Sequence, residues 1–181
     1  MGRPKALLEY EGRSFVARGV AMVRAAGCSP VLVVDGAHRL DGLIEPGLLV
    51  HNERWELGPL ASVQAGLRHA LTLEPALAGL LVHPVERPRV QAATISGLLA
   101  GSSAEPEGLW QPVHAGRSGH PMVWPRTLFH ALLNLDPAHH SARSLVRGAA
   151  AGMRRKLEVD DPGVLENIDS PEDLARLTAP T

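Results

Sequence analysis

Runs of hydrophobic residues alternate along this chain with stretches of helical periodicity. Segment 31–35 (Val-Leu-Val-Val-Asp) is apolar up to its closing acid, and segment 79–85 (Gly-Leu-Leu-Val-His-Pro-Val) begins in the same way. Such continuous runs are typical of parallel strands that are covered on both faces. Weaker patterns predict further strands at 47–51, 108–113, 122–124 and 156–160.

Between these runs, the apolar residues recur at the spacing of α-helices. Val16, Val20 and Val23 share one face of a helix predicted over 15–26, and Ser14 precedes it as a plausible N-cap. Other helices are expected at 60–73, 92–99, 126–133 and 142–150, and the capping residues Ser170, Pro171 and Asp173 predict a last one.

Strands that alternate with helices predict an α/β domain, here one domain over residues 1–181, with a mostly parallel sheet and helices on both of its faces. In open sheets of this kind, ligands bind beyond the carboxyl ends of the strands. The residues that follow Val50, Val85 and Asp160 are therefore the first candidates for a site.

The composition of the chain argues against several classes of partner. Lys and Arg total 18 against 19 Asp and Glu, and aromatic residues make up 3%, which argues against a nucleic-acid-binding surface. No apolar run approaches the roughly 20 residues of a membrane-spanning helix, and the amino end shows no signal-peptide pattern. The single cysteine, Cys28, excludes an intramolecular disulfide. We expect a cytoplasmic protein and leave its oligomeric state open.

Candidate chemistry begins at the amino end, where Gly2 and Arg3 stand close before Lys5. A glycine-rich loop offers backbone amides to phosphates, and a lysine adds a point charge. The segment Met-Gly-Arg-Pro-Lys-Ala-Leu-Leu resembles the second half of the signature of the MobA-like nucleotidyltransferases, which include molybdenum-cofactor cytidylyl- and guanylyltransferases. The resemblance implies nucleotide binding by Gly2, Arg3 and Lys5; the alternative is an ordinary surface lysine.

Segment 52–63 (Asn-Glu-Arg-Trp-Glu-Leu-Gly-Pro-Leu-Ala-Ser-Val) is similar to the part of this family that contacts the nucleotide base. Asn52, Gly58 and Ser62 are the residues that the resemblance assigns to the nucleotide. The alternative is a loop and first helical turn around a buried Trp55.

Segment 82–88 (Val-His-Pro-Val-Glu-Arg-Pro) looks like the metal-binding turn of the family, with Glu86 in place of the usual Asp. A carboxylate at the end of a strand suits Mg²⁺ that bridges triphosphate oxygens. The resemblance therefore makes Glu86 a metal ligand and catalytic residue beside Lys5. The alternative is that neighbouring Arg87 forms a salt bridge with Glu86 and removes it from metal binding.

Two later segments complete the resemblance, which covers essentially the whole chain. Gly-His-Pro at 119–121 implies that His120 contacts the acceptor, although a turn with a satisfied histidine would look the same. The closing Asn-Ile-Asp-Ser-Pro-Glu-Asp-Leu at 167–174 implies an acceptor role for Asn167 and a metal role for Asp169. Helix capping explains Ser170 to Asp173 but leaves Asp169 unexplained.

The implied fold is a three-layer, Rossmann-like α/β fold of the nucleotide-diphospho-sugar transferase type. The family pattern opens with a strand and a Leu-Ala-Ala-Gly loop that has no counterpart here. That strand lies in the middle of the family's sheet, so its absence would leave two strand edges unpaired. Either translation starts further upstream, or the chain is a shortened relative with a rearranged sheet.

The resemblance implies a Mg²⁺-dependent transfer of a nucleoside monophosphate from a nucleoside triphosphate, CTP in preference to GTP, to molybdopterin or another small phosphorylated acceptor. Pyrophosphate is released. One alternative is an inactive or truncated relative that acts as a nucleotide-binding or partner module. Another is a sugar-phosphate nucleotidyltransferase.

Overall fold

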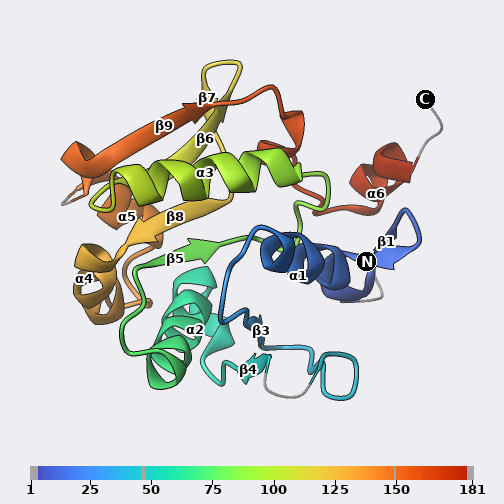
Figure 1. The fold of residues 1–181 in the computed structure, drawn as a ribbon. Coiled ribbons are helices and arrows are strands. Elements are labelled where there is room, and N and C mark those ends of the chain that lie inside the picture. Colours follow the sequence, from blue (N-terminus) through green and yellow to red (C-terminus); the bar gives the residue numbers. More distant parts are fainter. Residues whose placement is uncertain (1–3, 46–47, 149, 179–181) are drawn as a thin grey trace.

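The computed structural model describes residues 4–45, 48–148 and 150–178 as alternating strands and helices (Figure 1). Its α-helices are α1 (Phe15–Ala25), α2 (Pro59–Leu73), α3 (Ala92–Ala104), α4 (Phe129–Asn134), α5 (Ala142–Arg147) and α6 (Pro171–Thr178). Its strands are β1 (Glu9–Tyr10), β2 (Arg13–Ser14), β3 (Val33–Asp35), β4 (Leu49–His51), β5 (Gly79–Val82), β6 (Leu109–His114), β7 (Arg117–Ser118), β8 (Met122–Pro125) and β9 (Arg154–Glu158).

Local sequence explains where the helices start and stop. The Ser14 hydroxyl accepts a hydrogen bond from the Ala17 amide at 3.3 Å, as an N-cap does, and Gly27 ends α1 with φ of 90°. Glu11 and Gly12 both have positive φ, which builds the tight β1–β2 hairpin that the sequence patterns did not indicate.

Helices cover both faces of the sheet, as expected. On one face, α2, α4 and α5 pack with β6 and β8 into the larger core, which includes Leu67, Leu109 and Leu132. On the other face, α1 and α3 form a smaller core around Val23 and Ile95. The predicted three-layer α/β class is therefore confirmed.

The larger sheet has the order β5-β8-β6-β7, and β9 pairs with the other side of β6. Strand β8 runs antiparallel to both β5 and β6, while β6 and β9 run parallel. Strands β5, β6 and β9 therefore point one way and β7 and β8 the other, so the sheet is mixed where we expected mostly parallel neighbours. The short connection through β7 accounts for the reversal, because it leaves no room for a crossover helix.

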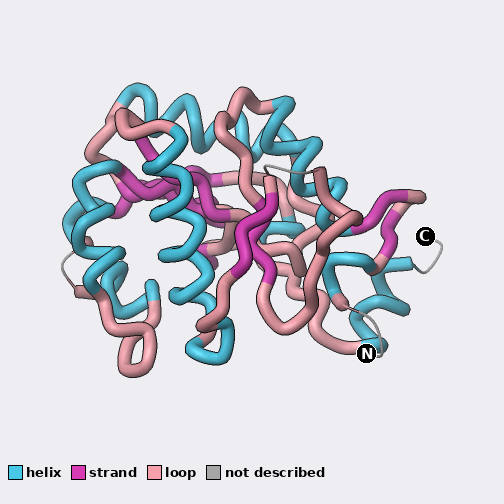
Figure 2. Tube along the Cα trace, turned by 90° about the horizontal axis from the view of Figure 1, so that it is seen from below, coloured by secondary structure: helices cyan, strands magenta, loops and turns pink. Residues whose placement is uncertain are grey.

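Strands β3 and β4 form a separate parallel ribbon, paired from Val33 with Leu49 to Asp35 with His51. No strand pairing among the described residues joins this ribbon to the larger sheet. Figure 2, seen from below, shows the ribbon in front of that sheet. A cavity of about 1780 Å³ lies between β3 and β5 and is lined by both strands. Among the described residues, β3 pairs with β4 and β5 with β8, so each of these two strands has one edge without a strand partner.

The two ends of the described chain lie together. Leu8 and Phe15 pack against Ile168 and Leu177 in a small cluster that joins α1 to α6. No helix in the described ranges has both the length and the apolar character needed to cross a membrane.

Candidate functional site

Lys5, Asn167 and Asp169 form one polar cluster. The Lys5 ammonium group makes an ion pair with one carboxylate oxygen of Asp169, and the Asn167 side-chain amide donates to the other oxygen. The Lys5 side chain is 37% exposed and that of Asp169 52%. Ion pairs this exposed contribute little to stability, so an incoming phosphate or cation can replace either partner at low cost.

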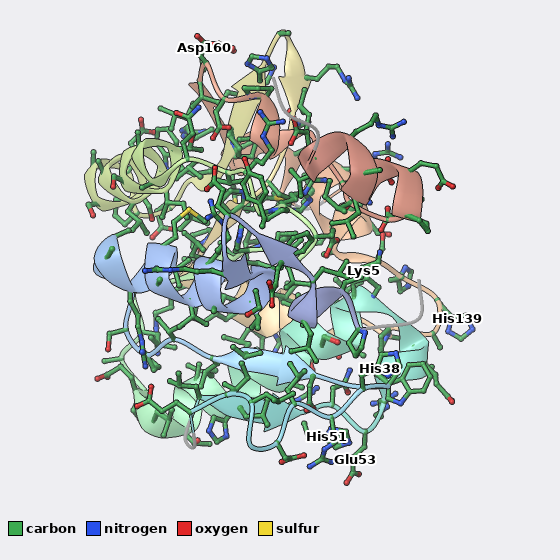
Figure 3. All side chains as sticks on the ribbon, turned by 90° about the vertical axis from the view of Figure 1, so that its right-hand side faces the viewer. Lys5, His38, His51, Glu53, His139 and Asp160 are labelled. Atoms are coloured by element: carbon green, nitrogen blue, oxygen red, sulfur yellow. The ribbon has the colours of Figure 1, made fainter. Side chains whose placement is uncertain are left out.

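The cap of α6 fixes the backbone at Asp169. The Asp173 carboxylate accepts hydrogen bonds from the amides of Asp169 at 3.1 Å and Ser170 at 2.9 Å, while the Ser170 hydroxyl accepts from the Asp173 amide at 3.1 Å. The Ser170 hydroxyl also donates to the Asp173 carboxylate at 2.9 Å, and this bond first, then those from the two amides, lowers the pKa of Asp173. The cap therefore uses Asp173 and leaves the Asp169 side chain directed to Lys5 and Asn167. Figure 3 shows Lys5 beside the C-terminal helix, on the same side of the molecule as His51 and Glu53.

Glu86 reaches the same neighbourhood from the end of β5. Its backbone carbonyl accepts a hydrogen bond from the Ile168 amide at 3.0 Å, which joins the turn after β5 to the segment before α6. In the described part of the chain, the Glu86 carboxylate has no ion pair within 4.0 Å. The structure thus brings the two predicted metal ligands, Glu86 and Asp169, onto adjacent segments.

Arg87 does not neutralise Glu86. Its guanidinium group donates instead to the backbone carbonyls of Val164 at 2.6 Å and Glu166 at 2.8 Å. Burial lowers the pKa of Arg87, and the nearby charges of Glu86 and Asp169 act in the opposite direction. The arginine therefore ties the C-terminal segment to the turn after β5.

The carboxylates at this site suit a metal ion that is also bound by substrate phosphates. The described residues contain no group of three or more His, Cys, Asp or Glu side chains placed to hold a metal ion by themselves. Mg²⁺ commonly takes one or two carboxylates and completes its shell with water and substrate phosphates. Glu86 and Asp169 could supply such carboxylates, whereas a closed protein cage does not fit.

Asn52 and Ser62 contact one another, and Ser62 lines the cavity. Asn52 follows β4 and is 4% exposed; its side-chain amide donates to the Ser62 hydroxyl at 3.0 Å, and its carbonyl oxygen accepts from the Arg54 amide at 2.9 Å. Gly58 sits between them in sequence, with φ of 87° at the start of α2. Only glycine adopts that conformation without strain, so the turn into α2 depends on it.

Trp55 differs from the buried residue considered as an alternative. This residue is 42% exposed and lies against Gly36, where an added Cβ would be 2.5 Å from the Trp55 Cβ. The segment 52–62 therefore presents an aromatic surface to solvent beside the predicted base-binding residues.

His120 belongs to a group of buried polar side chains that the motifs only partly revealed. The side-chain polar atoms found buried without a hydrogen-bond partner in the described chain are His83 Nδ1, Arg87 Nε and His120 Nδ1. Burial, and then the charge of Arg87, lowers the pKa of both His83 and His120 to about 4. Both imidazoles are therefore neutral at neutral pH and have unused hydrogen-bonding capacity.

The sequence motifs also did not include a contact between Asp35 and His51. Asp35 ends β3 with its side chain buried, and its carboxylate lies 2.6 Å from His51 Nδ1 at the end of β4. The other oxygen accepts from the Leu40 amide at 2.9 Å. The sequence did offer one signal for this contact: an acid and a histidine each end one of two successive apolar runs. Their role is to join β3, β4 and the following loop.

The cavity connects these groups. Its lining includes Glu86 and His120 together with Gly58 and Ser62. The cluster of Lys5, Asn167 and Asp169 lies next to Glu86 through the contact between the backbones of Glu86 and Ile168. The predicted residues Gly2 and Arg3 lie outside the described residues.

Comparison with known proteins gives a consistent result. The family description "MobA-like NTP transferase domain" matches residues 1–157. Nicotine blue oxidoreductase of Paenarthrobacter nicotinovorans is 31% identical over 98% of this chain and 89% of its own. Molybdenum cofactor guanylyltransferase of Ectopseudomonas mendocina is 27% identical over 96% and 83%, respectively.

Solved structures show the same fold. Rv0371c from Mycobacterium tuberculosis superimposes with a TM-score of 0.76 at 24% identity, covering 98% of this chain and 90% of its own. Its manganese complex gives a TM-score of 0.71, covering 97% of this chain and 92% of that one at 24% identity. For the 2-C-methyl-D-erythritol 4-phosphate cytidylyltransferase of Thermus thermophilus the TM-score is 0.68 at 23% identity, over 96% and 92% of the two chains. With a family description that spans most of its length, the chain belongs to the MobA-like NTP transferase family.

Proposed function

We propose that this chain binds a nucleoside triphosphate with a divalent metal ion and transfers the nucleoside monophosphate to a small phosphorylated acceptor. An acceptor phosphate oxygen attacks the α-phosphorus, the bond between that phosphorus and the α–β bridging oxygen breaks, and pyrophosphate leaves. The observation that carries the proposal is the convergence of Lys5, Asn167 and Asp169 beside Glu86, which lines the same cavity as Ser62.

The residues have separate roles in this proposal. Lys5 neutralises phosphate charge, and Glu86 with Asp169 holds Mg²⁺ or Mn²⁺, which supplies further charge neutralisation when bound. Asn52, Gly58 and Ser62 face the base. His120 and Asn167 face the acceptor, with His120 as a neutral hydrogen-bonding group. Such transfers depend mainly on positioning and electrostatic stabilisation.

The base and the acceptor are inferred from relatives. Two relatives are named molybdenum cofactor guanylyltransferase, which favours GTP over the CTP preferred from the sequence motifs. The same names support molybdopterin as the acceptor. The cytoplasm stays our proposed location.

A second candidate is a binding module without transferase activity. The relative named nicotine blue oxidoreductase covers nearly the whole chain, so the fold serves at least one protein with another name. The open edge between β3 and β5 also favours this alternative. Pyrophosphate release separates the two: a transferase releases it only when metal, triphosphate and acceptor are all present, whereas a binding module releases none.

Lys5 offers the sharpest test of nucleotide binding, because the chain's other lysine, Lys156, lies exposed on β9 as a matched control. Replacing Lys5 with Ala removes a charge-assisted contact to phosphate and should weaken GTP binding at least about tenfold, or ~1.4 kcal/mol. Lys156→Ala should leave the affinity unchanged. Calorimetric titration with GTP and CTP, with and without Mg²⁺, measures this; equal affinity in the two variants would contradict the role of Lys5.

Glu86→Gln tests the metal. The amide keeps the shape of the side chain and removes its charge, so the gain in GTP affinity from Mg²⁺ or Mn²⁺ should fall by about tenfold. Glu172→Gln, at the exposed start of α6, is the matched control. If the metal strengthens GTP binding equally in both variants, Glu86 is not a metal ligand.

A further inference from the structure

Two histidines and an arginine that lie close together at one end of the sheet hold buried polar atoms without a hydrogen-bond partner. In the described chain these atoms are His83 Nδ1, His120 Nδ1 and Arg87 Nε. Strand β5 ends one residue before His83, and its antiparallel partner β8 begins two residues after His120, so the two histidines stand at the same end of the paired strands. The His120 amide and the Arg87 guanidinium group both donate to the Val164 carbonyl, at 3.0 and 2.6 Å.

Burial decides where the imidazole pair, His83 and His120, carries its protons. Both rings are neutral at neutral pH, because burial, and then the charge of Arg87, lowers the pKa of each to about 4. A neutral imidazole has its proton on one ring nitrogen. A proton on the buried Nδ1 would be a donor without an acceptor, whereas a lone pair at Nδ1 is stabilised by the positive charge of Arg87. The proton of each ring therefore resides on Nε2.

The Nε2 edges of the imidazole pair reach the cavity. Both residues line it, neither Nε2 atom is among the buried atoms without a partner, and no hydrogen bond within the described chain uses one. Gly19, inside α1, keeps space beside His83: an added Cβ would lie 3.3 Å from the His83 Cδ2 and 3.7 Å from its Nε2. Glycine is a poor helix former, so its place in α1 fits a need for this space. The pair thus presents two N–H donors to the cavity.

The charges around the cavity favour an anion. Among the described residues, its lining holds one carboxylate, that of Glu86, and the guanidinium groups of Arg143, Arg147 and Arg154. The charge of Arg143 acts on His120, and no carboxylate of the described chain lies within 4.0 Å of Arg143 as an ion-pair partner. Two N–H donors beside a guanidinium group match the oxygens of a phosphate. An apolar ligand would leave these donors unpaired.

We propose that His83 is a specificity-determining residue of an oxyanion site, in which its Nε2–H donates to a phosphate oxygen while His120 and Arg143 bind the same phosphate. His83 supplies the second of two neutral donors, from the segment after β5, and so lets the site hold two oxygens of one group. The assignment of this phosphate to the acceptor or to the pyrophosphate product rests on the proposed function, whereas the binding of an oxyanion does not.

Nitrogen NMR of the 181-residue chain with isotope-labelled histidine tests the proposal. Inorganic phosphate is the probe, and no nucleotide or metal is present. Before phosphate is added, His83 and His120 should both show the tautomer protonated at Nε2. Phosphate should then shift the two Nε2 signals along one binding curve and leave the signals of His130, exposed on α4, unchanged. Protonation at Nδ1, or a phosphate titration that shifts neither Nε2 signal, would overturn the proposal.

Two substitutions of His83 separate phosphate binding from folding. In His83→Gln the side-chain amide reaches about the position of Nε2, so phosphate affinity should stay within about threefold of the parent value. His83→Phe keeps a ring but has no donor and should lower the affinity at least about tenfold. His130→Phe is the control and should change nothing. Equal affinity in the Gln and Phe variants, both shown by urea unfolding to be folded, would overturn the proposal; if the Phe variant does not fold, the titration of the parent chain decides.

Binding of GTP with Mg²⁺ then identifies the source of the phosphate. If the phosphate belongs to the acceptor, His83→Phe leaves GTP affinity unchanged. If it belongs to the part of the nucleotide that leaves as pyrophosphate, the same variant weakens GTP binding as well as phosphate binding. A chain that binds phosphate at the imidazole pair but never releases pyrophosphate from GTP would contradict the proposed function and leave the oxyanion site standing.

Discussion

Strands β5 and β8 are neighbours of equal length with similar apolar sequences, yet their burial differs. All four residues of β8 are buried, and all four residues of β5 are half-buried. Among the residues that the structure describes, β8 has a strand on each side, β6 and β5, whereas β5 pairs with β8 alone. Hydrophobicity alone therefore does not decide burial in this molecule; the presence of a second strand partner does. The closed side around β6 and β8 and the open side around β3 and β5 should respond differently to change.

The largest difference should appear when one leucine on each side is shortened. Leu109 of β6 is fully buried, and its replacement by Ala should cost about 2–5 kcal/mol of unfolding free energy, as core cavities do. Leu81→Ala on β5 removes the same atoms from a half-buried site and should cost less than about 2 kcal/mol. Urea denaturation of both variants measures the contrast, and equal losses would remove the distinction between the two sides.

Lowering the pH should destabilise the fold at the boundary between the closed and the open side, where His83 follows β5 and His120 precedes β8. Their pKa values of about 4 lie below the ordinary 6.5, so the unfolded chain binds more protons between these limits. Their contribution to stability is complete above pH 6.5 and is lost as the pH falls to 4, by at least ~1 kcal/mol for each histidine.

Substituting these residues shows whether they cause the acid sensitivity. His83→Asn and His120→Asn each remove one titrating group, so the midpoint of urea unfolding should fall less steeply between pH 6.5 and 4 than it does in the parent chain. His130→Asn, an exposed histidine on α4, should leave the slope unchanged. An unaltered slope in the first two variants would mean that both imidazoles are already charged or solvated.

The smallest effect should come from Gly58, on the open side. Its φ of 87° strains any other residue, so Gly58→Ala should cost about 1 kcal/mol. Gly152, whose backbone has no such constraint and where an added Cβ meets nothing within 4 Å, is the matched control. If Gly152→Ala lowers the free energy of unfolding as much as Gly58→Ala does, the turn into α2 does not require Gly58.

Sequence patterns predicted correctly those features that depend on residues close together in the chain. Ser14 and Ser170 cap their helices as expected, because a cap depends on residues within one turn. The reversed direction of β8 was not foreseen, since pairing is decided by distant partners. The pairing of Lys5 with Asp169 joins residues 164 positions apart; the motifs named both residues but not their contact. His83 was not identified from the sequence, and Arg87 was considered only as a salt-bridge partner of Glu86, because burial, not spacing, makes these two side chains unusual.

In the proposed function, one nucleotide site joins the segment leading into α2, the turn after β5 and the segment before α6. Hydrogen exchange with and without GTP and Mg²⁺ tests it most directly. We expect GTP with Mg²⁺ to slow exchange together in 52–62, 83–87 and 167–169, the segments that hold Ser62, Glu86 and Asp169. Exchange that changes in none of these segments, or in only one of them, would contradict the claim.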